Sequence, residues 1–504
     1  MKWALLLVGM VAGSVFAEPP LQVGSKRFTE SYILGEVIRQ TAEAAGETGA
    51  VHRQGLGNTA IVFNALAAGS VDIYPDYTGT IALEILKLDK VPPLAALNEK
   101  LLPLGLTVGI PLGFNNTYAL AMRAGEAERL NIRSLSDLAT HPELKLGLSQ
   151  EFIGRKDGWE GLKRVYGLPQ VTPRGLDHGL AYEGIAASQV DVIDIYSTDA
   201  KIERYKLLVL ADDREYFPRY DALLVYRADL PKRFPQAWQA LQKLHGAIST
   251  AAMIRLNGEA ELQGREFSAI ARDFLSGSKG GAVDKPRFLD RLFGPDFWRL
   301  LGEHLTLVFV SLAAGTAIGI PLAIAATRQP RLAGLVLGTT GVIQTIPSLA
   351  LLAMLIPVVG RIGTLPALIA LALYALLPIV RNTYVGLTQV PRTMVQAGLA
   401  LGLERVTILR VIELPLALPT ILAGVKTAAV INVGTATIAA FIGAGGFGER
   451  IAIGLALNDN AALLAGAIPA AVLALLMEWG FGLLDRLFVP RYSRPGPASG
   501  QPGM

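Results

Sequence analysis

The apolar positions follow one pattern in the first part of the chain and another in the second part. Up to about residue 276, short apolar runs of strand type alternate with longer amphipathic stretches of helix type. This alternation predicts an α/β fold with a mainly parallel sheet, and the length of the region favours two lobes. The expected strands are 21–24, 71–73, 144–148, 191–196, 207–210 and 222–226, and the expected helices include 32–45, 58–68, 159–166, 180–188 and 235–246.

Long apolar segments take over after residue 300. Each is long enough to cross a membrane as a helix, and they lie at about 304–326, 333–357, 364–384, 417–441 and 461–484. The stretch before them is rich in glycine, proline and charged residues, which is typical of a linker. We therefore divide the chain into an α/β domain at 18–276, a linker at 277–299, an all-α membrane domain of about five helices at 300–490 and a tail at 491–504.

The first residues have the pattern of a secretory signal peptide. Lys2 precedes an apolar run, and the small residue Ala17 ends a cleavage-type sequence. We expect residues 1–17 to be removed, and the alternative is an uncleaved anchor helix. In both cases the α/β domain would be exported.

Arginines in the loops between the apolar segments predict the same orientation, because positively charged loops stay on the cytoplasmic side. If the α/β domain is outside, the outer loops carry Arg361 and Arg450. The inner segments then carry Arg328, Arg331, Arg392, Arg405, Arg410, Arg486, Arg491 and Arg494. We expect a multi-pass protein of the inner (plasma) membrane, with its α/β domain on the periplasmic or extracellular side.

Composition excludes several classes of function. The 504 residues contain no cysteine, which rules out disulfides and thiolate metal sites. The net charge of +4 is too small to indicate binding to nucleic acid. No P-loop and no motif with catalytic spacing occurs, so the chain should neither bind ATP in the usual way nor act as an enzyme. We expect it to hold no cofactor and no metal.

Tyrosines stand out near the ends of the expected strands and in the turns that follow. Ligands of open α/β sheets bind beyond the carboxyl ends of strands. Converging tyrosine rings there would suit a quaternary ammonium ion, which has no N–H to donate and is held by π-faces. The alternative for any single tyrosine is packing at a lobe surface with a solvated hydroxyl. The tyrosines in question are Tyr74, Tyr77, Tyr118, Tyr196, Tyr216 and Tyr220.

These segments resemble, in order along the chain, the substrate-binding proteins of osmoprotectant ABC transporters for glycine betaine, choline and carnitine. The most specific match is Asp-Ile-Tyr-Pro-Asp-Tyr-Thr-Gly-Thr at 72–80, and Gly-Ser-Lys-Arg-Phe-Thr-Glu at 24–30 resembles the family's first strand-to-helix turn. The resemblance implies a two-lobed, periplasmic-binding-protein-like domain of type II. It also implies an aromatic cage for the ligand's cation, built by position from Tyr77, Tyr118, Tyr196 and Tyr220, with Tyr74 in reserve.

Two turns depart from the family pattern. Ser31 stands where the family has glutamine, and Asn58 and Thr59 follow Gly57 where the family has Gly-Gly-Thr. Both turns open a helix, where free N–H groups suit a ligand carboxylate. We count Ser31, Asn58 and Thr59 as candidate ligand contacts, and simple N-cap chemistry is the alternative for the second turn. The departures leave room for choline or another betaine-like solute.

The loop between the third and fourth apolar segments contains Gln-Ala-Gly at 396–398, then Gly402, Ile412 and Leu-Pro at 414–415. This pattern resembles the EAA loop of type I ABC importer permeases. Its spacing predicts two short helices joined at Gly402, because glycine adopts a left-handed backbone easily. The resemblance implies docking on a separate ATPase subunit, and an interfacial amphipathic helix pair is the alternative. The candidate coupling residues are Gln396, Ala397, Gly398, Gly402, Ile412, Leu414 and Pro415.

Three polar residues lie inside apolar segments, namely Gln344, Ser348 and Asn432. They suit the lining of a pore, and hydrogen bonding between helices suits them equally. We therefore interpret the chain as a fused solute-binding and permease subunit of an ATP-driven importer for quaternary ammonium compounds. The expected partners are two copies of an ATP-binding subunit, a second permease copy, the solute and membrane lipid. A ligand-gated channel, a sensor that does not transport, and an importer of another amino-acid-like solute are the alternatives.

Overall fold

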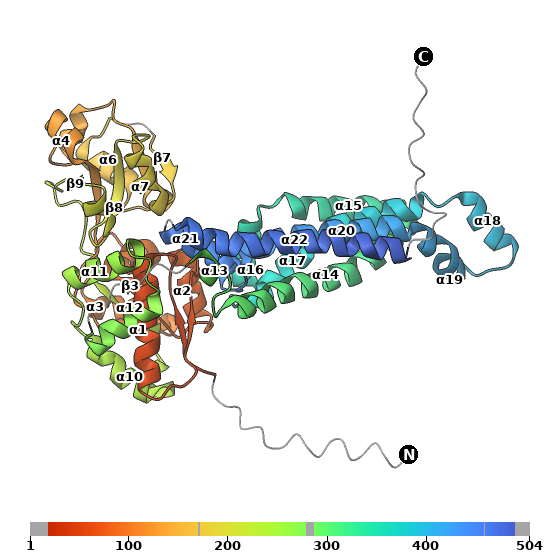
Figure 1. Ribbon diagram of the computed structural model, residues 1–504, viewed down its shortest axis with the longest axis horizontal. Helices are drawn as coiled ribbons and strands as arrows, with labels where there is room; N and C mark the ends of the chain where they lie inside the picture. The colour runs from red at the N-terminus through yellow and green to blue at the C-terminus, as the bar shows by residue number, and fades with distance from the viewer. Residues whose placement is uncertain (1–18, 170–171, 279–286, 458, 489–504) are drawn as a thin grey trace, which may run out of the picture.

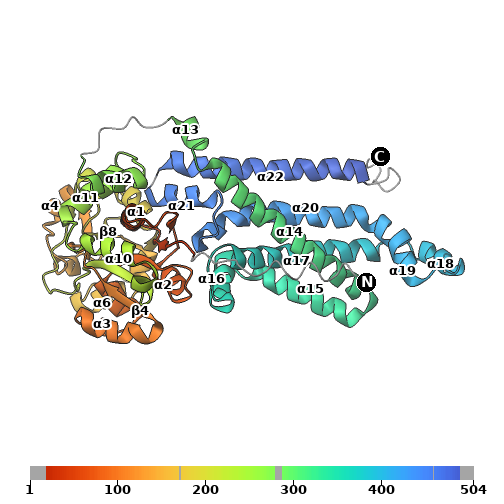
Figure 2. The same ribbon diagram turned by 90° about the horizontal axis from the view of Figure 1, so that it is seen from below.

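The computed structural model describes residues 19–169, 172–278, 287–457 and 459–488. The predicted signal peptide (1–17) and tail (491–504) lie outside these ranges. A two-lobed α/β domain sits at one end of an elongated bundle of membrane-type helices (Figures 1 and 2).

The first lobe is built on a five-stranded sheet with the order β2-β1-β3-β10-β4. β10 is antiparallel to β3 and β4, and the other pairs are parallel. The strands are β1 (Gln22–Gly24), β2 (Val51–Arg53), β3 (Ile73–Tyr77), β4 (Leu106–Gly109) and β10 (Ala222–Arg227). The main helices around the sheet are α1 (Thr29–Ala44), α2 (Thr59–Ala67), α3 (Leu94–Leu101), α10 (Pro235–Leu241), α11 (Thr250–Glu261) and α12 (Phe267–Ser276).

The second lobe repeats this plan with the order β7-β6-β8-β5-β9, in which β5 runs antiparallel to β8 and β9. Two crossing segments join the lobes and meet at a bridge between Asn115 and Asp221. The strands are β5 (Tyr118–Arg123), β6 (Leu146–Ser149), β7 (Arg174–Leu176), β8 (Val192–Tyr196) and β9 (Leu207–Val209). The main helices are α4 (Ala124–Leu130), α5 (Gln150–Gly154), α6 (Trp159–Tyr166), α7 (His178–Ala186) and α8 (Lys201–Arg204).

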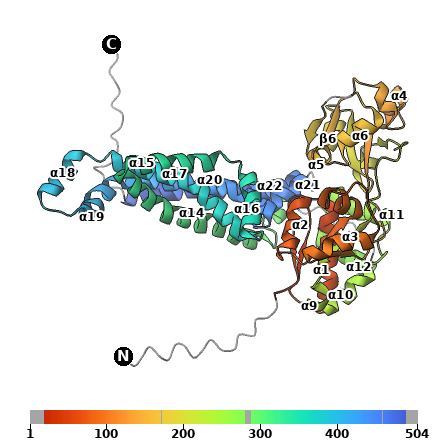
Figure 3. The ribbon, with the colours of Figure 1, turned by 180° about the vertical axis from the view of Figure 1, so that it is seen from behind.

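The membrane domain contains four helices, among the described residues, that are long and apolar enough to cross a membrane. A bent pair of helices raises this number to as many as five. The long helices run side by side away from the α/β domain (Figure 3). They are α14 (Phe297–Arg328), α17 (Thr364–Thr388), α20 (Leu414–Ala439, within an apolar helical stretch that starts at Arg405) and α22 (Asn460–Phe488).

The segment predicted as one helix over 333–357 is instead two helices, α15 (Pro330–Thr345) and α16 (Ser348–Val359), bent by 102°. The bend follows from Pro347, because a residue that precedes proline is pushed out of the helical region. Ile346 is accordingly extended. Its carbonyl accepts a hydrogen bond from the hydroxyl of Tyr374 on α17, which satisfies the backbone group at the break.

The α/β domain packs on the near end of the helix bundle. Ile61 of α2 contacts the core of the membrane domain, and Ile362, in the turn after α16, packs against the core of the first lobe. Ile453 and Leu457 of α21 (Gly448–Leu457) pack against the other face of that lobe. The short helix α13 (Phe288–Leu292) lies between the two domains, where the side chain of Arg450 donates to the carbonyl of Leu292 at 2.8 Å. The first lobe is therefore held by apolar contacts on two sides.

Candidate functional site

A cavity of about 260 Å³ lies between the two lobes. It is formed where the strands and helix starts of both lobes converge, as expected for ligand sites of open α/β sheets. Five tyrosines from both lobes and a crossing segment line it, namely Tyr77, Tyr118, Tyr182, Tyr196 and Tyr220. The cavity therefore combines a set of π-faces with charged and polar groups at the starts of α1, α5 and α7.

Strand pairing places two of these rings together. Tyr118 begins β5 and Tyr196 ends β8, and the antiparallel register makes them direct partners. Directly paired residues point to the same face of a sheet. Their ring centroids are 5.0 Å apart, and the ring of Tyr220 lies 5.7 Å from that of Tyr118. Three rings thus enclose one end of the cavity.

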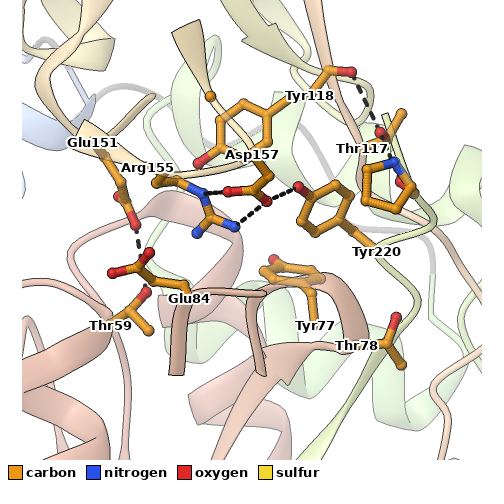
Figure 4. A network of polar contacts seen from close by, with 12 residues as sticks. Thr59, Tyr77, Thr78, Glu84, Thr117, Tyr118, Glu151, Arg155, Asp157 and Tyr220 are labelled. Carbon is orange, nitrogen blue, oxygen red and sulfur yellow. Dashed lines mark hydrogen bonds and ion pairs between the residues drawn. The ribbon is translucent and has the colours of Figure 1, made fainter. Parts of the chain in front are cut away.

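Tyr220 is fixed by a buried ion pair behind it. Its hydroxyl donates to Asp157, which is held by the guanidinium of Arg155 at 2.6 and 2.8 Å (Figure 4). Arg155 also lies 5.4 Å from the centroid of Tyr118 and 5.9 Å from that of Tyr220. Its side chain is 3% exposed, so the contacts with these rings are desolvated. The ion pair therefore sets the orientation of two cavity rings.

Tyr77 is oriented by a buried carboxylate. Its hydroxyl donates to Oε1 of Glu30, which also accepts from Asn116 Nδ2 at 3.0 Å. The other oxygen, Oε2, accepts from Thr198 Oγ1 at 2.6 Å and Asn257 Nδ2 at 3.1 Å. Glu30 lies in the first turn of α1, and it lines the cavity together with Tyr77. One carboxylate thus joins α1, β3, a crossing segment, the second lobe and α11.

The cationic side chains on the cavity wall, Lys26, Arg27, His178 and Lys201, are each matched by a carboxylate. Lys26 Nζ lies 2.7 Å from Asp76, and Arg27 lies 3.3 Å from Asp177. His178, the first residue of α7, bonds Asp199 at 2.9 Å and packs on the ring of Tyr196 at 4.4 Å. Burial disfavours the imidazolium, but Asp199 and Asp194 outweigh it and raise the pKa of His178 to about 9.

The other predicted ligand contacts are divided between the cavity wall and its surroundings. Ser31 lines the cavity, and its Oγ accepts from the backbone N–H of Lys26 at 2.9 Å. Thr59 lies outside the lining and bonds Glu151 of the second lobe at 3.4 Å (Figure 4). Asn58 caps α2 by accepting from the backbone N–H of Ile61 at 3.3 Å.

Tyr74 lies away from the cavity. It lies three residues before Tyr77 on β3. Because successive side chains of a strand point to opposite faces, the two tyrosines lie on opposite faces of the sheet. Tyr74 accordingly packs in the core below the sheet, whereas Tyr77 reaches the cavity. The strand predicted at 71–73 ends at Ile73, whereas β3 begins at Ile73 and contains both tyrosines.

Sequence reasoning overlooked several cavity groups, although some lay inside the motifs that it used. Lys26 and Glu30 both belong to the 24–30 segment, and His178 follows the N-cap residue Asp177. Charged residues directly at a strand-to-helix turn were the available signal. Asn257 on α11 gave no such signal, because its role depends on the return of the chain to the first lobe.

The candidate coupling loop lies at the end of the bundle opposite the α/β domain (Figure 1). Helix α18 (Arg392–Ala400) contains Gln396, Ala397 and Gly398, and the turn after it has Gly402 at φ +77°. A Cβ on Gly398 would lie 3.0 Å from Ile412 Cδ1, so the loop closes on itself there. α19 (Arg405–Ile408) and a π-helical turn (Leu409–Glu413) lead into α20, which begins with Leu414 and Pro415.

The three polar residues predicted inside the bundle differ in their surroundings. Asn432 on α20 is fully buried and donates to Ser311 Oγ on α14 at 2.8 Å. It therefore joins two helices. Gln344 and Ser348 are half-buried on either side of the bend between α15 and α16.

Comparison with known proteins assigns both parts of the chain. Residues 19–277 match the family model of the substrate binding domain of ABC-type glycine betaine transport systems. Residues 315–491 match the binding-protein-dependent transport system inner membrane component.

Three relatives illustrate the similarity. A glycine-betaine-binding protein of Pseudomonas aeruginosa is 32% identical, over 54% of this chain and 92% of that protein. A glycine betaine/carnitine/choline transport system permease protein of Bacillus subtilis is 39% identical, over 38% of this chain and 87% of that protein. An ergothioneine transport permease/ergothioneine binding protein of Helicobacter pylori is 33% identical, over 53% of this chain and 49% of that protein. The chain thus matches about half the length of this last relative.

A two-lobed binding domain joined to a polytopic helical domain defines a transport protein that combines solute capture with a membrane component. The chain belongs to the family of substrate-binding domains of ABC-type glycine betaine transport systems, and it carries a permease of the same class in one polypeptide. The permease relatives and the apolar helices make it a multi-pass protein of the inner membrane.

Proposed function

We propose that the chain is the fused solute-binding and permease subunit of an ATP-driven importer for quaternary ammonium compounds of the glycine betaine, choline and carnitine class. The observation that carries this proposal is the set of tyrosine rings around one end of the cavity. A quaternary ammonium ion offers no hydrogen-bond donor, so converging π-faces are the groups that recognise it. Relatives of both halves carry the names of such solutes.

The cavity also suits the closing motion of a binding protein. Contacts from one lobe to the other surround it, including Arg27 with Asp177 and Lys201 with Glu261 at 3.7 Å. Lobes joined by two crossing segments can close by hinge motion. In this proposal the solute enters the open cleft, the lobes close, and the permease then opens a path at the end of the bundle where the domain is docked.

The energy would come from a separate subunit. The loop from Arg392 to Glu413 presents apolar side chains to solvent at the far end of the bundle, and Leu401 is 81% exposed. An apolar surface of this kind at the inner face suits docking of a partner protein. We propose two copies of an ATP-binding subunit on a permease homodimer, with Gln344, Ser348 and Asn432 near the solute path and the binding domain on the periplasmic side.

Calorimetric titration of the full chain in lipid nanodiscs tests the solute class. The panel is choline, glycine betaine, carnitine and ergothioneine, with ordinary amino acids for comparison. We expect one quaternary amine to bind, and Tyr196→Ala to weaken it about tenfold or more, the loss expected for one desolvated cation–π contact. Tyr205→Ala is the matched control, because Tyr205 is in the same lobe and outside the cavity lining. Binding of an amino acid alone would reject the quaternary ammonium class.

A further inference from the structure

The carboxylate of Glu30 is saturated with hydrogen-bond donors. Its two oxygens accept four bonds, from a phenol, a hydroxyl and two amides. A protonated carboxyl would need an acceptor for its own proton. The carbonyl-type oxygens Oδ1 of Asn116 and Asn257 have no hydrogen-bond partner within the described part of the chain, since both amides present their nitrogen to Glu30. The arrangement therefore fits an ionised carboxylate.

This negative charge has no cationic partner of its own among the described residues. Lys26, the nearest lysine in the sequence, pairs with Asp76, and its Nζ lies 5.3 Å from the centroid of the Tyr77 ring. Burial raises the pKa of Glu30, and the four donors counteract that effect only in part. A buried, unpaired charge is costly to maintain unless something compensates it. The start of α1 supplies part of the compensation through its partial positive charge.

The charge lies at the cavity wall that also carries the cage. The hydroxyl of Tyr77 donates a hydrogen bond to Glu30, and the ring of Tyr77 lines the same cavity as those of Tyr118, Tyr196 and Tyr220. Hydrogen bonding to an anion makes a phenol ring more electron-rich, and a nearby anion attracts a cation through a medium of low dielectric constant. The cavity is therefore more favourable to a cation than four neutral rings would be.

We propose that Glu30 is the counter-charge for the solute's quaternary ammonium group, acting through Tyr77 and across the cavity without a direct hydrogen bond to the ligand. This assignment rests on the proposed function. In this role Glu30 is a specificity-determining residue, because it favours a permanent cation over an uncharged group of the same shape. Tyr77 and Asn257 of the first lobe, Asn116 of a crossing segment and Thr198 of the second lobe hold the carboxylate in place.

The test compares ligands that differ only in charge. In neohexanol a carbon atom replaces the nitrogen of choline, and in tert-butylacetate a carbon atom replaces that of glycine betaine. Dissociation constants are measured on the full chain in nanodiscs for whichever pair contains a bound solute. The wild-type chain should bind the quaternary amine more tightly than its carbon analogue.

Glu30→Gln is expected to reduce this preference about 10- to 100-fold, the effect of one charge at a few ångströms in a partly polar medium. The variant can be accommodated, because Asn116 and Asn257 can turn their free oxygens toward the new amide. Glu36→Gln is the matched control. Glu36 is a buried acid on the same helix, but it pairs with His52 at 2.8 Å and lies outside the cavity lining. The Glu36→Gln variant should prefer the quaternary amine over its carbon analogue as strongly as the wild type does.

Glu30→Asp provides a second variant that retains the charge. It should bind both ligands more weakly and keep the preference for the cation. Loss of the preference in Glu30→Asp, or a parallel weakening of both ligands in Glu30→Gln, would show that Glu30 only shapes the cage. Either result would reject the role of Glu30 as counter-charge and would leave the proposed function standing. Failure of the wild-type chain to bind any quaternary amine would overturn both.

Discussion

The guanidinium of Arg27 lies 5.1 Å from the centroid of the Phe441 ring. Arg27 belongs to the first lobe, and the same side chain bonds Asp177 of the second lobe at 3.3 Å. Phe441 lies in the short helical turn Ala440–Ile442 that follows α20, the helix whose other end begins at the candidate coupling loop. One arginine therefore contacts both lobes and the permease, at the mouth of the solute cavity.

This contact predicts that Phe441→Ala weakens docking without weakening solute binding. A cation–π pair of this kind contributes about 0.5–1 kcal/mol when it is partly exposed. Residues 54–58 lie against the permease, since a Cβ on Gly57 would come within 3.2 Å of the carbonyl oxygen of Phe441. Their backbone amide hydrogens should then exchange faster in the full chain, as measured by mass spectrometry. Arg27→Lys should have a smaller effect, because lysine keeps the charge near Asp177 and loses only the planar stacking.

Trp298→Ala is the control for that experiment. Trp298 is an aromatic residue near the same end of the bundle, and it is 75% exposed. Its removal should leave the exchange of residues 54–58 unchanged. Equal exchange in Phe441→Ala and in the wild type would mean that apolar contacts such as that of Ile61 hold the domain without help from Arg27.

Gly79 gives a second prediction, because the ring of Tyr220 lies directly on it. A Cβ at this position would come within 2.4 Å of Cδ1 of that ring. Gly79→Ala should therefore displace Tyr220 from the cavity wall and weaken solute binding about tenfold, although residue 79 itself is outside the lining. Titration calorimetry on the full chain measures the loss.

The control for Gly79 is Gly125→Ala in α4, where nothing lies within 4 Å of the added Cβ. We expect this variant to bind like the wild type, since alanine also favours a helix. Wild-type affinity in Gly79→Ala would show that the ring of Tyr220 can move aside, and so that it contributes little to the cage.

Much of the fold could be predicted from the sequence, because the pattern of apolar residues within a short segment is enough to indicate a helix. The helix predicted at 159–166 matches α6, and the two short helices joined at Gly402 are present with a positive φ. The strand predicted at 71–73 illustrates the limit. It runs instead from Ile73 to Tyr77 and contains Pro75, which discourages a strand prediction. Pro75 is tolerated because its pairing partner, Leu224, lies on an antiparallel neighbour whose register needs no N–H at this position.

The candidate site could be predicted only in part, because its polar groups come together through tertiary contacts. Strand-end tyrosines are visible as a pattern, and Tyr118 and Tyr196 meet because their strands pair. The residues that donate hydrogen bonds to the Glu30 carboxylate are spread along the sequence from Tyr77 to Asn257. No local spacing indicates such a set. The bend at Pro347 was also missed, since an apolar run of spanning length hides a break in the helix.

The His178–Asp199 pair predicts a dependence of stability on pH. The pKa of His178 is about 9 in the folded protein, above its ordinary value of 6.5. A folded-state pKa above the unfolded value means that the pair contributes its full stabilisation below pH 6.5 and loses it as the pH rises to about 9. The loss amounts to up to about 3 kcal/mol, and urea unfolding of the binding domain at a series of pH values measures it.

His178→Gln should flatten this part of the pH profile, because glutamine cannot carry the proton. The variant should be less stable than the wild type at pH 6.5 and similar to it above pH 9. A wild-type profile that is flat between these limits would contradict a charged His178. His245→Gln, at an exposed position of the first lobe, should reproduce the wild-type profile.

Gly402 carries the prediction for the coupling loop. Its φ of +77° lies in the left-handed region, which a β-branched side chain adopts only at a cost of about 1–2 kcal/mol or more. Nothing lies within 4 Å of an added Cβ, so backbone strain rather than a clash is the cause of any defect. Gly402→Val should distort the loop, leave solute affinity unchanged and reduce ATP-driven uptake into vesicles at least tenfold.

Gly338→Val, on an exposed face of α15, is the matched control, because its backbone is helical and open space surrounds it. If Gly402→Val transports as well as this control, the loop does not transmit ATP hydrolysis to the permease, and the partner subunit must dock elsewhere.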